Sequence, residues 1–395
     1  MMENRKNSPM LFYAYYFVIF FGTAIQYSFL MMYLNNAGMS SSIIGLVNGL
    51  TYIISFIVNP IYGTIADRVI NKNKVLIAGM IMSIVLLIFF SRVRSIFGLG
   101  LIMILFIATH NPLMGVYESI TIHHSLKNHW NYETIRMSGT LGYAVMALMS
   151  GYGLSKNENL IFPFYIAATI LATILACLLP PTPKALSKGD IRRENNENIF
   201  SLLKVKKIRN VMILYCLYML GTTFKQTYFG IYMIQLGGTY HLVGIANMLL
   251  ALSEIPFYLG PGRRWMKRIG IEKSMLFITF VGVFRWLLVG ISRTPTLLVI
   301  TMLFNGMMLV PIVTGMVKFL HESAPEHLKV SAQTTLRAPF MIGGQLLGTV
   351  VGGWIVGALD AAGLPGIRIG FAALAPLHLI LFVLVGWSMY KDKKV

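Results

Sequence analysis

Apolar stretches long enough to cross a lipid bilayer recur along the whole chain of 395 residues. A helix needs about 20 mostly apolar residues to span the hydrocarbon core. Hydrophobic residues make up 56% of the chain and charged residues 12%, against about 25% charged residues in soluble domains. We therefore predict an all-α integral membrane protein with twelve transmembrane helices, at residues 10–34, 43–66, 75–92, 97–122, 135–154, 161–180, 208–236, 242–262, 274–292, 297–320, 333–359 and 367–390.

Basic residues give the chain a formal net charge of +19, and their placement predicts its topology. With both termini in the cytoplasm, the cytoplasmic connections hold most of the lysines and arginines, including the run from Lys184 to Arg209. The opposite face then holds Arg92, Arg94, Lys156, Arg293 and Arg368. This excess follows the positive-inside rule and needs no polyanionic partner. We expect a multi-pass protein of the cell (inner) membrane with cytoplasmic termini and no nucleic-acid partner.

The sequence lacks the motifs of an enzyme or an ATP-driven pump. Cys177 and Cys216 both lie inside apolar stretches, which argues against a disulfide framework and a zinc site. There is no nucleotide-binding Gly-x-x-x-x-Gly-Lys-Ser/Thr loop and no nucleophile–base constellation. We expect no enzymatic activity, no cofactor and no metal, and a monomer in the bilayer.

One long polar interval, residues 181–207, divides the chain into an N-terminal part (1–180) and a C-terminal part (208–395). A related basic segment follows the second apolar stretch of each part, once from Gly63 to Lys74 and again from Gly262 to Lys273. We therefore predict two six-helix halves joined by a cytoplasmic central loop. Transporters built from such repeats bind their solutes near the midplane of the bilayer.

The segment Gly63-Thr-Ile-Ala-Asp67-Arg68 resembles the Gly-x-x-x-Asp-Arg signature of the major facilitator superfamily, and the resemblance covers essentially the whole chain. The glycine usually expected two residues after the arginine is Ile70 here. In that family the aspartate caps a neighbouring helix and the basic residues close the cytoplasmic side. The resemblance thus implies a gating role for Gly63, Asp67 and Arg68. A turn that carries only inside-positive charge is the alternative.

Two opposite charges lie inside apolar stretches, Glu118 near the end of one and Arg136 at the start of the next. Intramembrane charges cost about 2.5–3.5 kcal/mol on insertion scales and usually mark a solute or ion pathway. A hairpin would bring this pair together. A carboxylate and a guanidinium make directional hydrogen bonds to hydroxyls, and the ring of Tyr143 can cover the apolar side of a sugar or base. The alternatives are mutual neutralisation for the pair and simple packing for the tyrosine.

The same residues resemble those of the oligosaccharide:proton and nucleoside:proton symporters. The interval of 18 residues from Glu118 to Arg136 matches the acid and arginine that hold sugar hydroxyls there. The segment from Arg136 to Tyr143 resembles one whose glycines pack helices and whose last aromatic residue stacks on the sugar. Tyr143 stands where the lactose permease type has tryptophan, so galactoside selectivity does not follow.

Proton coupling needs a group that loads and releases a proton. Glu254 and Arg285 resemble the family's intramembrane acid and arginine, and we expect them to handle the proton. The family's histidine and glutamate on helix ten are absent, because residues 301–311 contain no ionisable side chain. Glu118 serving both proton and solute, or uncoupled transport, are therefore open alternatives.

Cationic residues outnumber acidic residues inside the predicted helices. The cations are Arg136, Lys225, Arg285 and Arg337, and the acids are Glu118 and Glu254. Buried charges usually meet a counter-ion. One hypothesis is that an anionic solute, such as a sugar acid or a phosphate ester, supplies the missing charge, with Lys225 as a binding residue. The alternative is that Lys225 or Arg337 lies near a helix end and reaches water.

The sequence thus predicts a secondary active transporter that imports a sugar- or nucleoside-like solute together with protons by alternating access. Its expected partners are that solute, protons and the lipid bilayer. A proton antiporter that exports drugs or amphipathic metabolites is the alternative.

Overall fold

The computed structural model describes residues 8–69, 71–182, 199–259, 264–265, 268–325 and 332–391. These residues form helices and short connections, and no β-strand occurs among them. Two compact units are present. The first comprises residues 1–39, 47–191 and 239–248, and the second comprises residues 40–46, 192–238 and 249–395.

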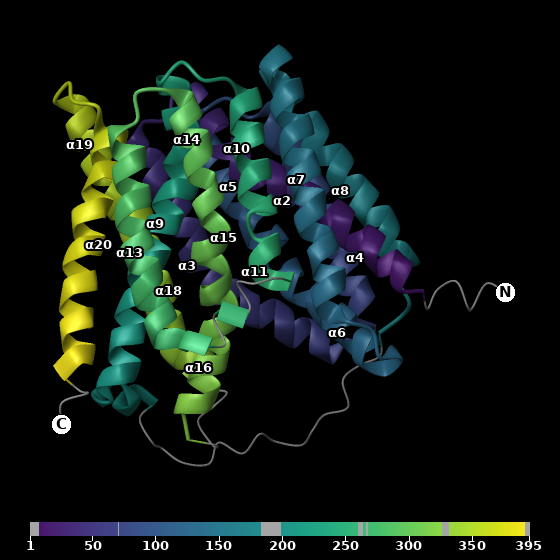
Figure 1. Ribbon diagram of the computed structural model, residues 1–395. Coiled ribbons are helices and arrows are strands. Elements are labelled where there is room, and N and C mark those ends of the chain that lie inside the picture. Colours follow the sequence, from purple (N-terminus) through teal and green to yellow (C-terminus); the bar gives the residue numbers. More distant parts are fainter. Residues whose placement is uncertain are drawn as a thin grey trace. The chain divides into compact units, whose positions relative to one another are not determined.

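The helices of the first half of the chain are long and mostly unbroken (Figure 1). They are α2 (Pro9–Asn36), α3 (Ser41–Arg68), α4 (Lys72–Arg92), α5 (Ile96–His110), α6 (Leu113–Asn128), α7 (Tyr132–Lys156), η1 (Glu158–Leu160) and α8 (Ile161–Leu178). Polar caps define several starts. The side chain of Ser8 caps α2, that of Asn71 caps α4 and that of Asn131 caps α7. The predicted stretch 97–122 is broken at Asn111–Pro112 into α5 and α6.

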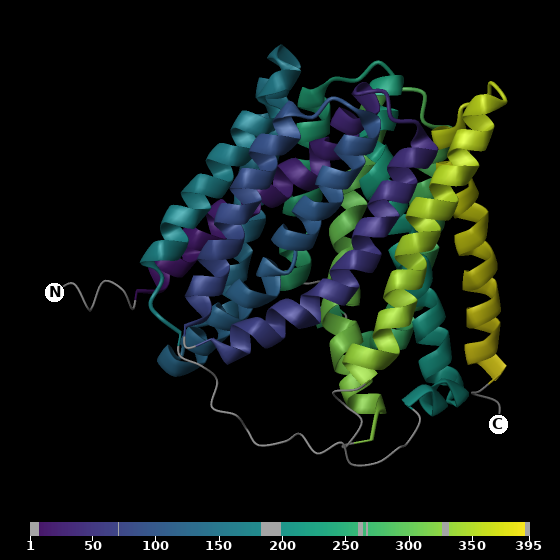
Figure 2. The same ribbon diagram turned by 180° about the vertical axis from the view of Figure 1, so that it is seen from behind.

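The second half of the chain combines the long helices α9, α13 and α20 with shorter helical pieces, and Figure 2 shows the molecule from the opposite side. They are η2 (Ile199–Lys204), α9 (Lys206–Gln235), α10 (Tyr240–Leu252), α11 (Ile255–Leu259), α13 (Ile271–Ile291), α14 (Pro295–Thr301), η3 (Met302–Phe304), α15 (Asn305–Val310), η4 (Pro311–Gly315), α16 (Met316–Ser323), η6 (Ala332–Leu336), α18 (Arg337–Leu346), η7 (Leu347–Val351), α19 (Gly352–Ala361) and α20 (Gly366–Lys391). The segments η4, η6 and η7 are π-helical. Such wide turns in α-helices frequently mark functional sites.

Nine stretches of the described residues are long and apolar enough to cross a membrane, and every one overlaps a predicted span. Helices α7 and α9 coincide with the predicted stretches 135–154 and 208–236 but are not among the nine, because glycine and polar residues lower their hydropathy. The predicted stretch 297–320 is divided among α14, α15 and α16. The count of twelve and the division at 181–207 stay predictions, and residues 183–198 of that interval lie outside the described residues.

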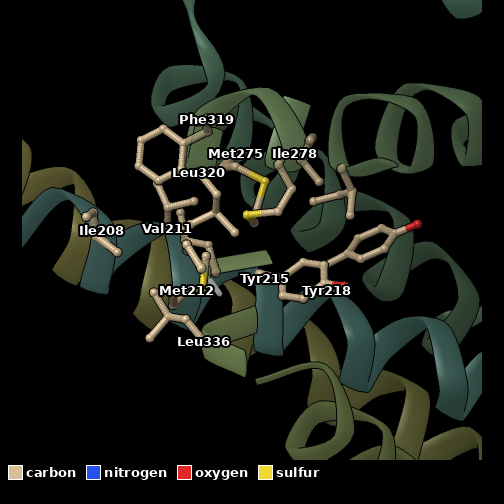
Figure 3. Close-up of a cluster of buried hydrophobic side chains, with 14 of the residues drawn as sticks. Ile208, Val211, Met212, Tyr215, Tyr218, Met275, Ile278, Phe319, Leu320 and Leu336 are labelled. Carbon is tan, nitrogen blue, oxygen red and sulfur yellow. The ribbon is translucent and has the colours of Figure 1, made fainter. Parts of the chain in front are cut away.

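Each unit has its own apolar core. In unit 1, α2 packs against α7 and α8, and residues such as Phe12, Tyr15 and Ile120 are fully buried. In unit 2, Figure 3 shows Met212, Tyr215, Met275, Phe319 and Leu320 converging from α9, α13 and α16. Fully burying a large apolar side chain contributes about 1.5–3 kcal/mol, so these cores fix the helices that carry the polar side chains inside each unit.

Candidate functional site

Glu118 and Arg136 form an ion pair in unit 1, with 3.7 Å between Oε1 and Nη1. The hairpin expected from the sequence makes this contact: His129 ends α6 in the left-handed conformation, and Asn131 accepts the first backbone N–H groups of α7. The side chains keep 25% and 39% of their exposure. An ion pair that retains this much solvent contact contributes only about 0–1 kcal/mol to stability. Its oxygens and nitrogens remain accessible to a polar guest.

Glu118 lines a cavity of about 450 Å³ inside unit 1. Its polar lining consists of Asn59, Asp67, Lys72, Asn111, Glu118 and Ser119. Gly63 lines the same cavity. The predicted binding carboxylate and two of the predicted gating residues therefore border one space.

The gating signature makes a specific contact there. The Nζ atom of Lys72 lies 2.6 Å from Oδ1 of Asp67 and also donates to the hydroxyl of Ser119, at 3.0 Å. The start of α4 is capped by Asn71, so the acceptor role of Asp67 is directed to the lysine at the first position of that helix. Arg68 is exposed at the end of α3. In the second copy of the signature, Gly262, Met266 and Lys267 lie outside the described residues, as does Ile70 in the first.

Tyr143 lies two helical turns beyond Arg136 on α7, and residues seven apart share a helix face. Its hydroxyl donates to Oδ1 of Asn247 at 3.3 Å and lies 3.4 Å from Oγ of Ser28, both in unit 1. The ring is half-buried. These hydrogen bonds hold the ring by its polar end.

Two glycines set the distance between α7 and α2. A Cβ atom on Gly142 would lie 1.9 Å from the carbonyl oxygen of Phe17, and one on Gly139 would lie 2.7 Å from the ring of Phe20. Only glycine permits this approach. The resemblance implied that the glycines of this segment pack helices together, and the observed contact matches that role. The contact fixes how α7, which carries Arg136 and Tyr143, is aligned against α2.

A second polar cluster is buried in unit 2. Asn305, at the start of α15, donates to Oε1 of Glu254 at 3.3 Å and accepts from Nζ of Lys225 at 3.5 Å. All three side chains are nearly inaccessible, with exposed fractions of 5–8%. Lys225 therefore lies in the interior. The alternative that the side chain of Lys225 reaches water is wrong.

Arg285, the expected proton-switching partner of Glu254, does not share these hydrogen bonds. Its Nη1 and Nη2 atoms lie 3.5 and 3.6 Å from the sulfur atoms of Met308 and Met302. Its Nε has no hydrogen-bond partner among the described residues. The side chain is 2% exposed.

A break between α10 and α11 positions Glu254. Pro256 has no backbone N–H to continue the hydrogen-bond ladder of α10, and the chain turns at Ser253 and Glu254 before α11 begins at Ile255. The Ser253 hydroxyl accepts from the backbone N–H of Gly306, at 2.8 Å. A Cβ atom on Gly306 would lie 1.9 Å from the carbonyl oxygen of Ser253, so glycine is required where α15 meets the break.

Sequence reasoning missed Asn305, because only ionisable residues were sought in the segment 301–311. An amide inside an apolar stretch was the available signal, since buried polar groups need partners. It also missed Lys72 as the partner of Asp67. Across the described ranges, no group of three or more His, Cys, Asp or Glu residues is placed to hold a metal ion.

Known proteins resemble this chain over nearly its full length. A model of the MFS_1 like family matches residues 10–363. The maltose permease of Geobacillus stearothermophilus is 26% identical over 357 residues, which cover 88% of this chain and 87% of the permease. YegT of Escherichia coli (strain K12), named for nucleoside transport, is 23% identical over 342 residues, covering 82% of this chain and 79% of YegT.

The crystal structure of the nucleoside transporter NupG matches with a TM-score of 0.83 over 97% of this chain and 99% of NupG. The sequence identity is 16%, so this likeness concerns the fold alone.

Proposed function

The chain belongs to the MFS_1 like family, and we propose on that basis that it is a secondary active transporter that moves a sugar- or nucleoside-like solute together with protons by alternating access. Membership confirms the predicted superfamily. With the nine apolar spans and the transporter relatives, it makes the chain a multi-pass membrane protein for a small solute, and not an enzyme.

The observation that carries the proposed solute class is the accessible Glu118–Arg136 pair beside the cavity of unit 1. A carboxylate accepts from hydroxyls and a guanidinium donates to them, so the pair satisfies both roles of a sugar or ribose hydroxyl. Tyr143, on the same face of α7, supplies the aromatic surface that a sugar ring or a nucleobase packs against. The named functions of the maltose permease and of YegT point to the same two solute classes.

Proton coupling is assigned to unit 2. Glu254 is a carboxylate with an exposed fraction of 8%, bonded to an amide that also contacts a lysine. Ionisable residues inside membrane segments commonly form proton relays. Glu254 would exchange the proton, and Arg285 would respond to the charge change as the cavity alternates between the two sides of the membrane.

The architecture belongs to the same proposal. Twelve transmembrane helices, two six-helix halves on either side of 181–207 and cytoplasmic termini in the cell membrane follow from the apolar stretches and the basic connections. Gly63, Asp67 and Arg68 would close the cytoplasmic side, with the Asp67–Lys72 contact as the element that opens and re-forms.

Uptake into proteoliposomes tests the proposal, using labelled sugars and nucleosides with and without an inward proton gradient. We expect a gradient-stimulated signal for one solute class, and loss of at least tenfold in Glu118→Ala and Arg136→Ala. The exposed Lys318–Glu322 pair, at 3.5 Å, gives the matched control, because Lys318→Ala and Glu322→Ala remove similar charges elsewhere. Proton-driven efflux of dyes with no uptake of any sugar or nucleoside would contradict import and favour the exporter.

A further inference from the structure

Positive charge is in excess in the buried cluster of unit 2. Lys225 on α9 and Arg285 on α13 have exposed fractions of 7% and 2%, and the accompanying carboxylate of Glu254 has 8%. When all three groups are ionised, the charges of these three side chains sum to +1.

The donors of these two cations are poorly used. A lysine ammonium has three donors and an arginine guanidinium five. The hydrogen bond of Lys225 to Asn305 is long, at 3.5 Å. Arg285 contacts the sulfur atoms of two methionines, which are weak acceptors, and its guanidinium carbon lies 5.0 Å from the centre of the Trp286 ring. Its Nε has no hydrogen-bond partner within the ranges that the structure describes.

This arrangement is costly without a further anion. Taking an ion out of water costs several kcal/mol even after relaxation, and attraction offsets the cost only where the remaining donors are satisfied. One carboxylate cannot balance two cations, and the sulfur contacts supply no charge. The unsatisfied guanidinium is therefore placed for a guest with an anionic oxygen.

We propose that Arg285 and Lys225 form a subsite for the carboxylate of a monoanionic solute, a sugar acid. The inference rests on the proposed function and narrows its substrate class. One excess positive charge matches one carboxylate, and the planar guanidinium presents paired donors to two carboxylate oxygens. Asn305 holds the lysine beside this subsite, and Glu254 offsets the one positive charge that the guest does not.

Binding to the purified full-length protein tests the subsite directly. Calorimetry would compare glucose with glucuronate and galactose with galacturonate, and glucose 6-phosphate would probe the phosphate alternative. We expect at least one uronate to bind tenfold or more tightly than its parent sugar. Equal affinity within each pair would overturn the proposal, and a preference for glucose 6-phosphate over both uronates would overturn the carboxylate assignment.

Charge-changing variants of the cluster should weaken or strengthen uronate binding according to the sign of the charge that they remove. Lys225→Gln and Arg285→Gln remove positive charge and should weaken uronate binding at least tenfold. Glu254→Gln removes negative charge and should strengthen uronate binding. Lys318→Gln, which removes an exposed charge on α16, should leave uronate binding unchanged. Arg285→Lys keeps the positive charge but lacks the paired donors of the guanidinium. Its uronate affinity tests the subsite if Arg285→Gln does not fold. A uronate affinity that is indifferent to all cluster variants contradicts the proposal.

The transport proposal and the carboxylate subsite can be refuted independently of each other. Uptake of neutral sugars or nucleosides without any uronate preference would leave the proposed function standing and remove the subsite. Tight uronate binding without uptake of any solute into vesicles would retain the subsite and remove the transport proposal.

Discussion

Gly306→Ala should disrupt the proton-handling region of unit 2. The added methyl carbon would lie 1.9 Å from the Ser253 carbonyl oxygen, whereas ordinary contact begins at 3.4 Å. The two backbones must therefore separate by the difference, about 1.5 Å. The adjacent hydrogen bond from Asn305 to Glu254 is already 3.3 Å long, and a shift of this size takes it beyond hydrogen-bonding range.

Overpacking of this kind costs about 1–3 kcal/mol. If the transporting state bears the whole cost, proton-driven uptake falls about 5–150-fold. The assay is gradient-driven uptake in proteoliposomes, with thermal unfolding of the same preparations. Gly343→Ala on α18 is the matched control, because its added methyl group would have no described atom within 4 Å apart from its chain neighbours and the backbone of its own helix. An alanine in a helix there should stabilise the protein slightly. Wild-type uptake and an unchanged melting temperature in Gly306→Ala would refute the close approach.

Further substitutions, in three regions of unit 1, test its contacts. Gly142→Ala should lower the melting temperature and uptake, because its methyl group would lie 1.9 Å from the Phe17 carbonyl oxygen; normal behaviour would contradict the tight packing of α2 on α7. Asp67→Asn should destabilise the protein by about 1 kcal/mol, since Lys72 keeps only 9% side-chain exposure and loses its counter-ion, and thermal unfolding should show part of the loss restored in Asp67→Asn/Lys72→Met. Tyr143→Phe keeps the aromatic face and should hold the uptake KM within about tenfold, whereas Tyr143→Ala should raise it further; equal effects of the two would argue against stacking.

The positions of the membrane helices could be predicted because a continuous stretch of about 20 apolar residues is typical of a helix that crosses a bilayer and is rare elsewhere. The contact of Glu118 with Arg136 could be predicted for a similar reason: opposite charges at the facing ends of two consecutive apolar stretches neutralise each other in a hairpin. The observed distance confirms that contact, while the functional role of the pair stays a prediction.

The partners inside unit 2 could not be predicted from charge alone. Glu254 bonds to the neutral amide of Asn305, and which of several intramembrane polar groups meet depends on the break at Ser253 and on the glycine that contacts it. Lys72 was missed as the partner of Asp67 because the expectation of a helix cap came from the resemblance, whereas Asn71 fills that role here.

Reversing the Glu118–Arg136 pair tests the central claim most directly. The double variant Glu118→Arg/Arg136→Glu preserves an ion pair between α6 and α7 but exchanges donor and acceptor around the solute. Uptake should fall at least tenfold in the double variant, as in each alanine variant, while thermal unfolding stays near that of the wild type. Recovery of wild-type uptake in the double variant would show that the two charges only neutralise each other.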